Sequence, residues 1–475
     1  MTAKPFLVDG EWRTGDGTFD VTSPYDGSVV AAVGVPTEAD VEEAAAKAAA
    51  AFAETSRLPV HARADALDHI SRRLAERVDE NAELIAREGG KPLKWSKAEA
   101  TRAIATFRWA SEVLRHGDDE VMRLDTEASL GSRLGIIRRF PFGPVLGITP
   151  FNFPLNLVAH KVAPAIAVGA PIVVKPARAT PLGALALAEL FVETDLPRAM
   201  YQVVTASSSV ADAMARDVRY RKISFTGSAE VGWYLKGLDP KKRVTLELGG
   251  NAGVIVHSDA DLDLAAARIA FGGYYQAGQS CISVQRVLVQ SEVYDDFCAR
   301  LVKQVESLKY GDPMDPTVDV GPVIDAGSLD RISEWVDESV SQGAEVLTGG
   351  RREDPFYVPT VLAKTTPEMK VRCEEVFGPV TAVAPYQTFE EAIAEVNNSR
   401  YGLQAGVFTN DLTRAFQAHR EIQAGGVIIN DQSAWRADQM PYGGSKDSGF
   451  GREGLRFAIE EMTEPRIMVL SNVPL

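Results

Sequence analysis

Four short apolar segments between residues 171 and 248 alternate with segments of helical pattern, and this alternation restricts the possible folds most strongly. The segments are PIVV at 171–174, YQVVT at 201–205, KISFT at 222–226 and VTLEL at 244–248. Strands that alternate with helices predict a mostly parallel sheet covered on both faces. Ligands bind such sheets beyond the carboxyl ends of the strands. We therefore expect an α/β fold with a site at those strand ends.

A second α/β series follows from about Asn251. It contains AGVIV at 252–256, a helical pattern at 261–278, RVLVQ at 286–290 and GGVIIN at 425–430. A chain of 475 residues is too long for a single hydrophobic core. We therefore expect two doubly wound, parallel-sheet domains that join near 248–251, with a cleft between them.

Three further segments carry local signals. Residues 38–115 are rich in Ala, Glu and Arg with helical periodicity, which predicts two or three helices. Thr180-Pro181 is predicted to open a helix through about Glu193, with Thr180 as its N-cap. The segment 123–141 is extended and hairpin-like. It breaks the α/β rhythm, so we expect an insertion or an arm.

Composition and charge exclude several classes of partner. The chain is 45% hydrophobic and 24% charged, as ordinary globular proteins are. Its net charge of -15 comes without a basic tract, which argues against nucleic acid or an anionic membrane as partner. The most apolar stretch, 155–174, contains His160, Lys161 and two prolines, and we interpret it as a buried helix followed by a strand. The first residues lack the apolar core of a secretory signal.

The cysteines also narrow the possibilities. Cys281, Cys298 and Cys373 are too few and too scattered for a disulfide framework, so a reducing cytoplasm is expected. No Cys or His cluster has the spacing of metal ligands. Cys281 stands in YYQAGQSCISVQR with few apolar neighbours, which is unusual for a packed cysteine. Cys281 is therefore either a packing residue or a catalytic nucleophile.

Two glycine-containing segments are candidate phosphate sites. GFGREG at 449–454 matches the pattern GxGxxG, but no strand precedes it, and we interpret it as a loop. In KISFTGSAEVG, Gly227 and Ser228 follow a strand and open a helix, where free N–H groups and the helix dipole favour phosphate. An ordinary turn with a capping serine explains the same residues, so both interpretations stay open.

Seven stretches together resemble the aldehyde dehydrogenase superfamily. They are PFNFP at 150–154, VVKPA at 173–177, FTGS at 225–228, LELGG at 246–250, GQSC at 278–281, EEVFGPV at 374–380 and PYGGSKDSGFGREG at 441–454. They occur in that family's order over most of the chain. PFNFPLNLVAHKV and WRADQMPYGG are most similar to the branch that acts on lactaldehyde, glyceraldehyde 3-phosphate and small phosphonylated aldehydes.

The resemblance implies three structural units. A cofactor-binding domain would take 1–122 and 142–248, with 431–460 packed near it. A catalytic domain would take 249–430. An oligomerisation arm, built from 123–141 and 461–475, would extend the sheet of a neighbouring copy in a homodimer or homotetramer.

The resemblance also assigns three catalytic residues for oxidation of an aldehyde to its acid. Cys281 matches the nucleophile that forms a thiohemiacetal and then a thioester. Asn152 matches the donor that stabilises the developing oxyanion. Glu247 matches the base that activates water to hydrolyse the thioester. The alternatives are a packed cysteine, a turn asparagine and a strand-end glutamate paired with a lysine.

NAD or NADP is the cofactor that the resemblance implies. The positions that match the family's cofactor contacts are Lys175 and Arg178 after the strand PIVV, Thr226, Gly227 and Ser228 in FTGS, Gly249 in LELGG, and Glu375 and Phe377 in EEVFGPV. NAD-preferring members often carry a glutamate where Arg178 stands. A guanidinium can pair with the 2′-phosphate of NADP, so we expect NADP to be accepted besides NAD; the alternative is Arg178 turned to solvent.

Four cationic residues are candidates for the substrate site. By motif position, His160 and Arg436 should line the substrate tunnel. Arg108 could approach it from a helix, and Arg286 follows the cysteine loop. Cationic groups in a pocket favour a small anionic or hydroxylated aldehyde. Alternatively, Arg436 pairs with Asp438 or Asp447 and serves structure alone.

Two other functions are compatible with the fold. A coenzyme A-acylating dehydrogenase would pass the thioester to a thiol and need no water-activating base, which the presence of Glu247 argues against. A non-catalytic structural or binding role is disfavoured by the joint presence of Cys281, Glu247 and Asn152.

Overall fold

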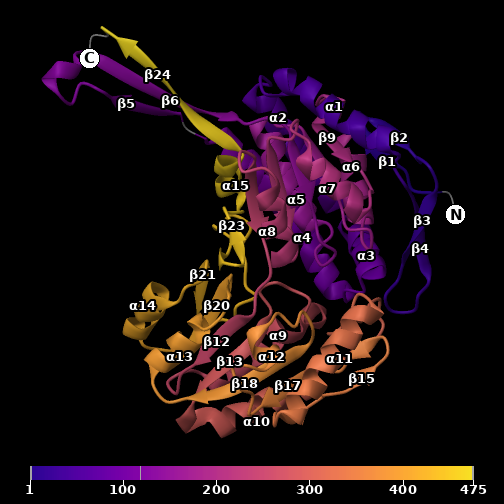
Figure 1. The fold of residues 1–475 in the computed structure, drawn as a ribbon, viewed down its shortest axis with the longest axis vertical. Coiled ribbons are helices and arrows are strands. Elements are labelled where there is room, and N and C mark those ends of the chain that lie inside the picture. Colours follow the sequence, from indigo (N-terminus) through magenta and orange to yellow (C-terminus); the bar gives the residue numbers. More distant parts are fainter. Residues whose placement is uncertain (1–2, 118, 473–475) are drawn as a thin grey trace.

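The computed structural model describes residues 3–117 and 119–472. Residues 1–2 and 118 of the expected cofactor-binding domain, and 473–475 of the expected arm, lie outside the described residues. Figure 1 shows two lobes and a long arm that projects from the upper lobe. No helix of the described residues is long and apolar enough to cross a membrane.

The upper lobe is built on an eight-stranded sheet. Its strands, in spatial order, are β2 (Glu11–Arg13), β1 (Phe6–Val8), β9 (Tyr201–Val203), β8 (Ile172–Lys175), β7 (Val145–Ile148), β10 (Lys222–Thr226), β11 (Arg243–Glu247) and β23 (Gly449–Phe450). The five strands from β9 to β11 run parallel. Four of these strands, β8, β9, β10 and β11, coincide with the four apolar segments of the sequence, and their residues are mostly buried, as in parallel sheets that are covered on both faces. The fifth strand, β7, was not predicted.

Helices form the outer layers of this lobe (Figure 1). They are α1 (Glu38–Thr55), α2 (Val60–Glu76), α3 (Val78–Gly89), α4 (Leu93–Arg115), α5 (Asn156–Val168), α6 (Leu182–Phe191), α7 (Ser208–Arg216) and α8 (Ala229–Leu238). The expectation of two or three helices within 38–115 was too low, because the chain forms four helices there and its three short breaks were not all recognised as helix boundaries. Pro59 and Pro92 stand as N-caps of two of the four helices.

The lower lobe contains a seven-stranded sheet. Its order is β14 (Glu345–Thr348), β17 (Thr360–Ala363), β18 (Val380–Tyr386), β13 (Val284–Gln290), β12 (Ala252–Val256), β20 (Gln404–Phe408) and β21 (Gly426–Ile429). Its helices are α9 (Leu262–Tyr274), α10 (Tyr294–Glu306), α11 (Ala326–Ser341), α12 (Lys370–Cys373), α13 (Phe389–Asn397) and α14 (Leu412–Glu421). All strand pairs are parallel except β14 with β17. The chain passes from β11 to β12, and so between the lobes, through residues 248–251.

The arm is a three-stranded antiparallel sheet. It joins β24 (Thr463–Ser471), β6 (Arg133–Pro141) and β5 (Glu120–Arg123) in that order. On β24, the side chains of Ile467, Met468 and Val469 are about half exposed, at 53%, 52% and 46%. Contiguous exposed apolar residues of this kind are typical of surfaces that contact another protein.

Smaller two-stranded sheets complete the secondary structure. They pair β3 (Thr18–Thr22) with β4 (Val29–Gly34), β15 (Arg352–Glu353) with β16 (Phe356–Tyr357), and β19 (Tyr401–Gly402) with β22 (Ser445–Lys446). GFGREG supplies the edge strand β23 and a turn into α15 (Leu455–Glu461). Because β23 pairs antiparallel with β11 at Glu247, the segment closes the sheet beside the pocket.

Two buried carboxylates cap the helices that follow the central strands. Glu88, from α3, accepts hydrogen bonds from the N–H groups of Leu182 and Gly183 at the start of α6. The expected N-cap Thr180 is therefore wrong: α6 begins at Leu182, and the Thr180 hydroxyl donates to the Phe151 carbonyl instead. A carboxylate from a distant helix replaces the local cap.

Glu99, on α4, does the same for α5. Its Oε1 accepts from the N–H groups of Leu155 and Asn156 at 3.0 and 3.1 Å, and its Oε2 pairs with buried Lys91. The Lys91 ammonium in turn lies 3.9 Å from the centre of the Phe153 ring. This pair thus fixes the turn PFNFP that precedes α5.

Replacing Glu99 tests that arrangement. Glu99→Gln leaves the Lys91 ammonium buried without a counter-charge, so we expect a loss of about 3–5 kcal/mol. The measurement is the urea midpoint of the first cooperative unfolding transition. Glu112→Gln, on the same helix, is the control, because Glu112 forms an exposed pair with Arg108 and should change stability by less than about 1 kcal/mol. Equal midpoints for the two variants would contradict the assignment.

Candidate active site

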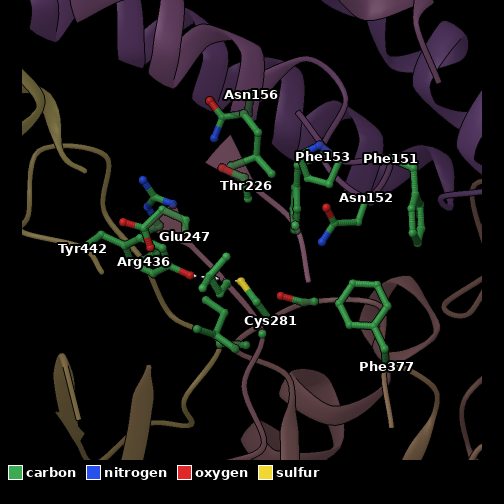
Figure 2. Close-up of a pocket in the computed structure, with 18 of the residues that line it drawn as sticks. Phe151, Asn152, Phe153, Asn156, Thr226, Glu247, Cys281, Phe377, Arg436 and Tyr442 are labelled. Atoms are coloured by element: carbon green, nitrogen blue, oxygen red, sulfur yellow. Dashed lines mark hydrogen bonds between the residues drawn. The ribbon is translucent and has the colours of Figure 1, made fainter. Parts of the chain in front are cut away.

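A cavity of about 330 Å³ contains most of the residues predicted from the sequence. Ten of them line it: Asn152, Thr226, Gly227, Ser228, Glu247, Gly249, Cys281, Glu375, Phe377 and Arg436. The upper lobe contributes the ends of β10 and β11, and the lower lobe contributes the cysteine loop. In Figure 2, Cys281 lies between an aromatic side with Phe151 and Phe377 and a polar side with Glu247, Arg436 and Tyr442.

The loop before Cys281 has an unusual backbone. Gln276, Ala277 and Gly278 have positive φ angles of 54°, 54° and 69°. A Cβ at Gly278 would overlap the carbonyl oxygen of Gly378, so this position requires glycine. Left-handed conformations of non-glycine residues cost energy and occur most often at functional sites. The strained loop brings the thiol to the wall of the cavity.

Cys281 is half-buried, and its sulfur has one hydrogen-bond partner among the described residues. The Tyr442 hydroxyl lies 3.2 Å from Sγ. Burial raises the pKa of the Cys281 thiol to about 12, with smaller contributions from the nearby carboxylates of Glu375 and Glu247. The Tyr442 hydrogen bond acts in the opposite direction and lowers this pKa.

Asn152 connects the upper lobe to the cysteine loop. Its Nδ2 donates to the Gln279 carbonyl at 3.0 Å, and its own carbonyl accepts from Gln276 Nε2. Its Oδ1 is buried and has no partner among the described residues. The side-chain amide therefore lies at the cavity wall, within the same hydrogen-bond network as the nucleophile loop.

Glu247 ends β11 and is buried. Neither carboxyl oxygen has a hydrogen-bond partner among the described residues, so the alternative of a lysine pair is not found. Burial, and then the negative charge of Glu453, raise the pKa of Glu247 well above its ordinary value. An unpaired carboxyl beside a cavity is suited to exchange protons with a molecule that enters it.

The FTGS turn contains the capping serine, and the interpretation as a phosphate site stays a prediction. Ser228 is the N-cap of α8, and its Oγ accepts from the N–H of Val231 at 3.4 Å. Gly227 and Ser228 also line the cavity. The free N–H groups at the start of α8 are therefore available to a phosphate group.

Gly249 lies close to the Glu375 carboxylate at the cavity wall. A Cβ on Gly249 would overlap Oε2 of Glu375, so a larger residue would displace that carboxylate. Glu375 accepts from the Gly250 N–H at 2.8 Å, and burial raises its pKa to about 7. Phe377 contacts Phe151 edge to face at 5.8 Å between ring centres. A cradle of glycines, a ring and a buried carboxyl fits a nicotinamide ribose.

Lys175, the last residue of β8, and Arg178, three residues later, are not among the residues that line the cavity. Lys175 is buried, and burial followed by the charge of Arg178 lowers its pKa. Arg178 is exposed, and its guanidinium lies 4.1 Å from the ring centre of Phe19. Two cationic groups next to a strand end are suited to hold the far ribose of a dinucleotide and a phosphate attached to it.

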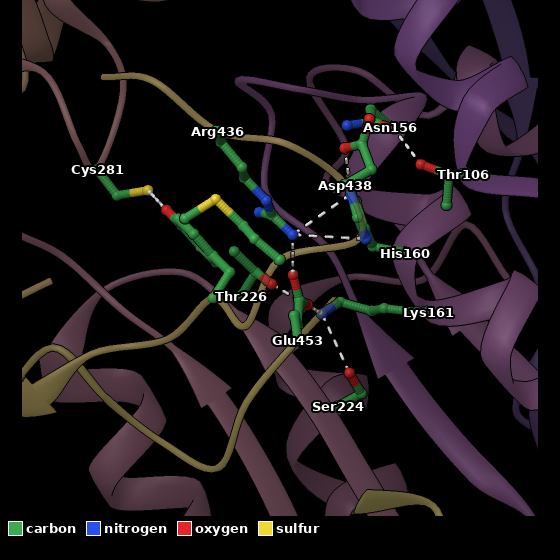
Figure 3. Close-up of polar contacts among 12 residues, drawn as sticks. Thr106, Asn156, His160, Lys161, Ser224, Thr226, Cys281, Arg436, Asp438 and Glu453 are labelled. Carbon is green, nitrogen blue, oxygen red and sulfur yellow. Dashed lines mark hydrogen bonds and ion pairs between the residues drawn. The ribbon is translucent and has the colours of Figure 1, made fainter. Parts of the chain in front are cut away.

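Arg436 lies at the polar end of the cavity within a buried charge network (Figure 3). It pairs with Glu453 at 3.2 Å, not with Asp438 or Asp447, and Glu453 also accepts from Lys161 at 3.1 Å. These cations lower the pKa of Glu453. The alternative that Arg436 pairs with Asp438 or Asp447 is therefore not found.

His160 lies behind Arg436 and does not line the cavity. Its Nε2 is 2.9 Å from Asp438 Oδ1, and burial with the charge of Arg436 lowers its pKa. A neutral imidazole therefore donates to Asp438. Asp438 also accepts from Arg102 at 2.7 Å, and Arg102 does line the cavity.

Two of the four cationic candidates lie away from the cavity. Arg108 is 59% exposed on α4 and approaches Glu112 at 3.6 Å. Arg286 is buried and donates hydrogen bonds to the backbone carbonyls of Asn251, Glu395 and Val396. It therefore connects separate segments of the lower lobe. Neither arginine is placed to touch a substrate in the cavity.

Sequence reasoning missed Arg102, Glu453 and Tyr442. Arg102 stands six residues before Arg108 on α4, a separation that places the two side chains on different faces of the helix. Choosing between them required the rotation of the helix, which the sequence did not supply. Tyr442 and Glu453 stood within the quoted motif at 441–454, and only the structure shows them at the cavity.

No group of His, Cys, Asp and Glu in the described part of the chain is arranged to hold a metal ion. The reactive groups that line the cavity are the Cys281 thiol, the unpaired Glu247 carboxyl and the guanidinium groups of Arg102 and Arg436.

Known proteins match the chain over nearly its whole length. The sequence profile of the aldehyde dehydrogenase family matches residues 12–468. A 3-sulfolactaldehyde dehydrogenase from Priestia aryabhattai is 42% identical over 465 residues, which are 98% of this chain and 97% of that protein.

Solved structures agree with the sequence match. Aldehyde dehydrogenase 21 from Physcomitrella patens, in complex with its reaction product succinate, has a TM-score of 0.97 at 42% identity and covers 100% of this chain and 99% of its own. Glyceraldehyde-3-phosphate dehydrogenase from Methanocaldococcus jannaschii, complexed with NADP, has a TM-score of 0.92 at 35% identity, with coverage of 96% and 99%. The α/β fold class and the resemblance found in the sequence are confirmed, and the chain belongs to the aldehyde dehydrogenase family.

Proposed function

We propose that this enzyme oxidises a small anionic aldehyde to its carboxylic acid with NADP or NAD. One observation carries the substrate class: Arg102 and Arg436 both line the cavity, and the buried Nε of each lacks a partner among the described residues. A buried N–H group without a partner is costly, so a ligand oxygen at that end would be stabilised.

The reaction follows from the groups around the cavity. The Cys281 sulfur adds to the aldehyde carbon, and the aldehyde oxygen gains negative charge. The side-chain amide of Asn152 and the backbone N–H of Cys281 would donate hydrogen bonds to that oxygen. A nicotinamide held beside Gly249, Glu375 and Phe377 would supply the acceptor for the hydride that this carbon loses. A thioester on Cys281 remains, and Glu247 takes a proton from the water that hydrolyses it. The acid leaves and the thiol is restored.

The comparisons support an anionic substrate. The relatives named above act on sulfolactaldehyde or glyceraldehyde 3-phosphate, or bind succinate. Each of these molecules carries an anionic group a few atoms from the reacting carbon. This chain presents guanidinium groups at the end of the cavity beyond Cys281, where such a group would lie.

Removing the thiol tests the reaction class. Cys281→Ala is expected to reduce aldehyde-dependent formation of reduced cofactor to background, because no other thiol lines the cavity. Absorbance of the reduced cofactor is the measurement. Cys373→Ala is the control, since Cys373 lies on α12 with its thiol facing the Glu368 carbonyl, and it should keep its activity. Full turnover by Cys281→Ala would refute the proposed function.

A substrate panel tests the anion site. Arg436→Gln removes a charged donor and is expected to lower kcat/KM about 10- to 100-fold for sulfonated, phosphorylated and carboxylated aldehydes. Lactaldehyde, which has no charge, should lose much less. Arg108→Gln is the matched control, because Arg108 is exposed and away from the cavity. Equal losses for charged and neutral aldehydes, or a preference of the native enzyme for long aliphatic aldehydes, would contradict the proposal.

NADP is proposed as an accepted cofactor besides NAD. Arg178 stands three residues after buried Lys175, and the effect on the lysine pKa reflects their proximity. A guanidinium at this position can pair with a 2′-phosphate, whereas a carboxylate would repel it.

Reversing the charge at Arg178 tests the cofactor proposal. Arg178→Glu should shift the ratio of kcat/KM for NADP over NAD toward NAD by about 10-fold or more, since a charged hydrogen bond is replaced by repulsion. Steady-state kinetics with both cofactors provide the ratio. The same variant should leave the ranking of aldehydes unchanged. A strong preference for NAD that Arg178→Glu does not alter would remove the proposal.

We further infer a homo-oligomer, a dimer or a tetramer, in a reducing cytoplasm. The exposed apolar side chains on β24 and the exposed edge strand β21 support pairing of the arm with another copy. The three free cysteines support a reducing compartment, because a nucleophilic thiol has to stay unpaired.

A further inference from the structure

Tyr442 lies next to the nucleophile Cys281 and has no role in the proposed reaction. It is buried, with 4% of its surface exposed, and its hydroxyl lies 3.2 Å from Cys281 Sγ. Figure 2 shows Tyr442 and Cys281 facing each other, with Arg436 beside Tyr442. The hydroxyl therefore reaches the sulfur that has to ionise before it can attack a carbonyl.

The direction of the hydrogen bond follows from the acidity of its two partners. Burial raises the pKa of Tyr442 well above its ordinary value, so the phenol keeps its proton at every pH at which the enzyme operates. A thiolate has no proton to give. Once the sulfur ionises, the hydroxyl can only donate, and its hydrogen bond stabilises the anion over the neutral thiol.

The ring of Tyr442 is held in place from two sides. The Arg436 guanidinium stacks on its face, with Cζ 3.7 Å from the ring centre. Its backbone forms a bridge with Glu453, with Tyr442 N donating at 3.0 Å and Tyr442 O accepting at 2.6 Å. Ile282 and Leu403 pack beside it in one apolar cluster. A fixed ring can present its hydroxyl at one point without reorganisation.

From this arrangement we propose that Tyr442 is a positioning residue whose hydroxyl donates to Cys281 Sγ and holds the ionised sulfur at the cavity wall. The proposal rests on the proposed function, because it assigns a role in preparing the same nucleophile. It also explains why Arg436, Tyr442 and Cys281 form a continuous chain of contacts from the anion end of the cavity to the sulfur.

Other charged groups also face the sulfur. Glu375, from the segment after α12, and Glu247, at the end of β11, oppose its ionisation, whereas Arg436 favours it. Tyr275, whose hydroxyl donates to Ser280 Oγ at 3.0 Å, lies on the same loop as the cysteine. Among these groups, Tyr442 is the one with a hydrogen bond to the sulfur itself.

Tyr442→Phe removes only the hydroxyl and keeps the ring on which Arg436 stacks. A hydrogen bond to a charged group corresponds to about 1 to 2 pH units in the ionisation of the thiol. A more basic thiolate is also a better nucleophile, which offsets about half of that change. We therefore expect alkylation of Cys281 by iodoacetamide to slow about 3- to 10-fold at each pH on the rising limb.

The measurement is the rate of Cys281 labelling as a function of pH, followed by peptide mass, with and without NADP. The rising limb of kcat/KM should move to higher pH in the same variant, because this limb reports ionisation in the free enzyme. Tyr275→Phe is the matched control: it loses a buried hydroxyl on the cysteine loop but keeps the contact of Sγ with Tyr442, so its labelling profile should match the native one. A thermal unfolding midpoint near the native value verifies that each variant is folded.

A second variant keeps the test decisive if Tyr442→Phe does not fold. Tyr442→3-fluorotyrosine makes the phenol a stronger donor and should speed labelling instead of slowing it. Superimposable native and Tyr442→Phe profiles, or faster labelling in Tyr442→Phe, would overturn the inference. Labelling does not require turnover, so this outcome is distinct from activity that survives Cys281→Ala, which would refute the proposed function.

Discussion

The hydrogen bonds between Asn152 and the loop at 276–279 are the interaction on which the site depends. They join the turn PFNFP of the upper lobe to the strained loop that carries Cys281 from the lower lobe. The turn is fixed in its own lobe by Glu99, which accepts from the first N–H groups of α5. The loop is fixed by Gly278, whose missing side chain permits contact with Gly378. The turn and the loop are thus each held in place within their own lobe, as precise positioning of reacting groups requires.

The partners of the buried carboxyl groups determine what each of them does. Glu88 and Glu99 accept from helix N-termini and serve the fold. Glu453 lies between Lys161 and Arg436, which keep its pKa low, so it remains a counter-charge. Glu247, with no partner, has a raised pKa, and part of that rise is the repulsion from Glu453. Environments that separate the pKa values of neighbouring acids identify which of them can exchange protons, and here they select Glu247.

Strand positions could be predicted from the sequence because buried parallel strands require continuous apolar runs, and PIVV, KISFT and VTLEL are such runs. Asn152 follows β7 and Glu247 ends β11, so both lie at carboxyl ends of parallel strands, where ligands bind such sheets. Cys281 lies before β13 and reaches the same cavity from the other lobe. Contacts that depend on helix rotation could not be predicted: Arg108 was chosen where Arg102 reaches the cavity. Helix capping by a carboxylate that is distant in sequence could not be predicted either, since about ninety residues separate Glu88 from the start of α6. Arg286 shows a third limit, because a buried arginine bound only to carbonyls is indistinguishable in sequence from a ligand-binding one.

The charge balance of the cavity indicates how an anionic aldehyde would be recognised. The protein carries a net charge of -15, so its long-range field does not attract anions, and salt screens that field beyond about 10 Å. Within the cavity, Arg102 is matched by Asp438 and Arg436 by Glu453, so no excess of positive charge is present there either. What remains is the two buried Nε–H groups of Arg102 and Arg436, which have no hydrogen-bond partner among the described residues. Recognition then depends on short, directed hydrogen bonds, and an anion gains from them only when its oxygens lie at the right distance from the carbon beside Cys281. Such a site selects aldehydes by the distance between the anionic group and the carbonyl carbon as much as by charge. If a carboxylate, sulfonate or phosphate lies one atom too far from the carbonyl carbon, the molecule cannot contact the guanidinium groups and Cys281 Sγ at the same time.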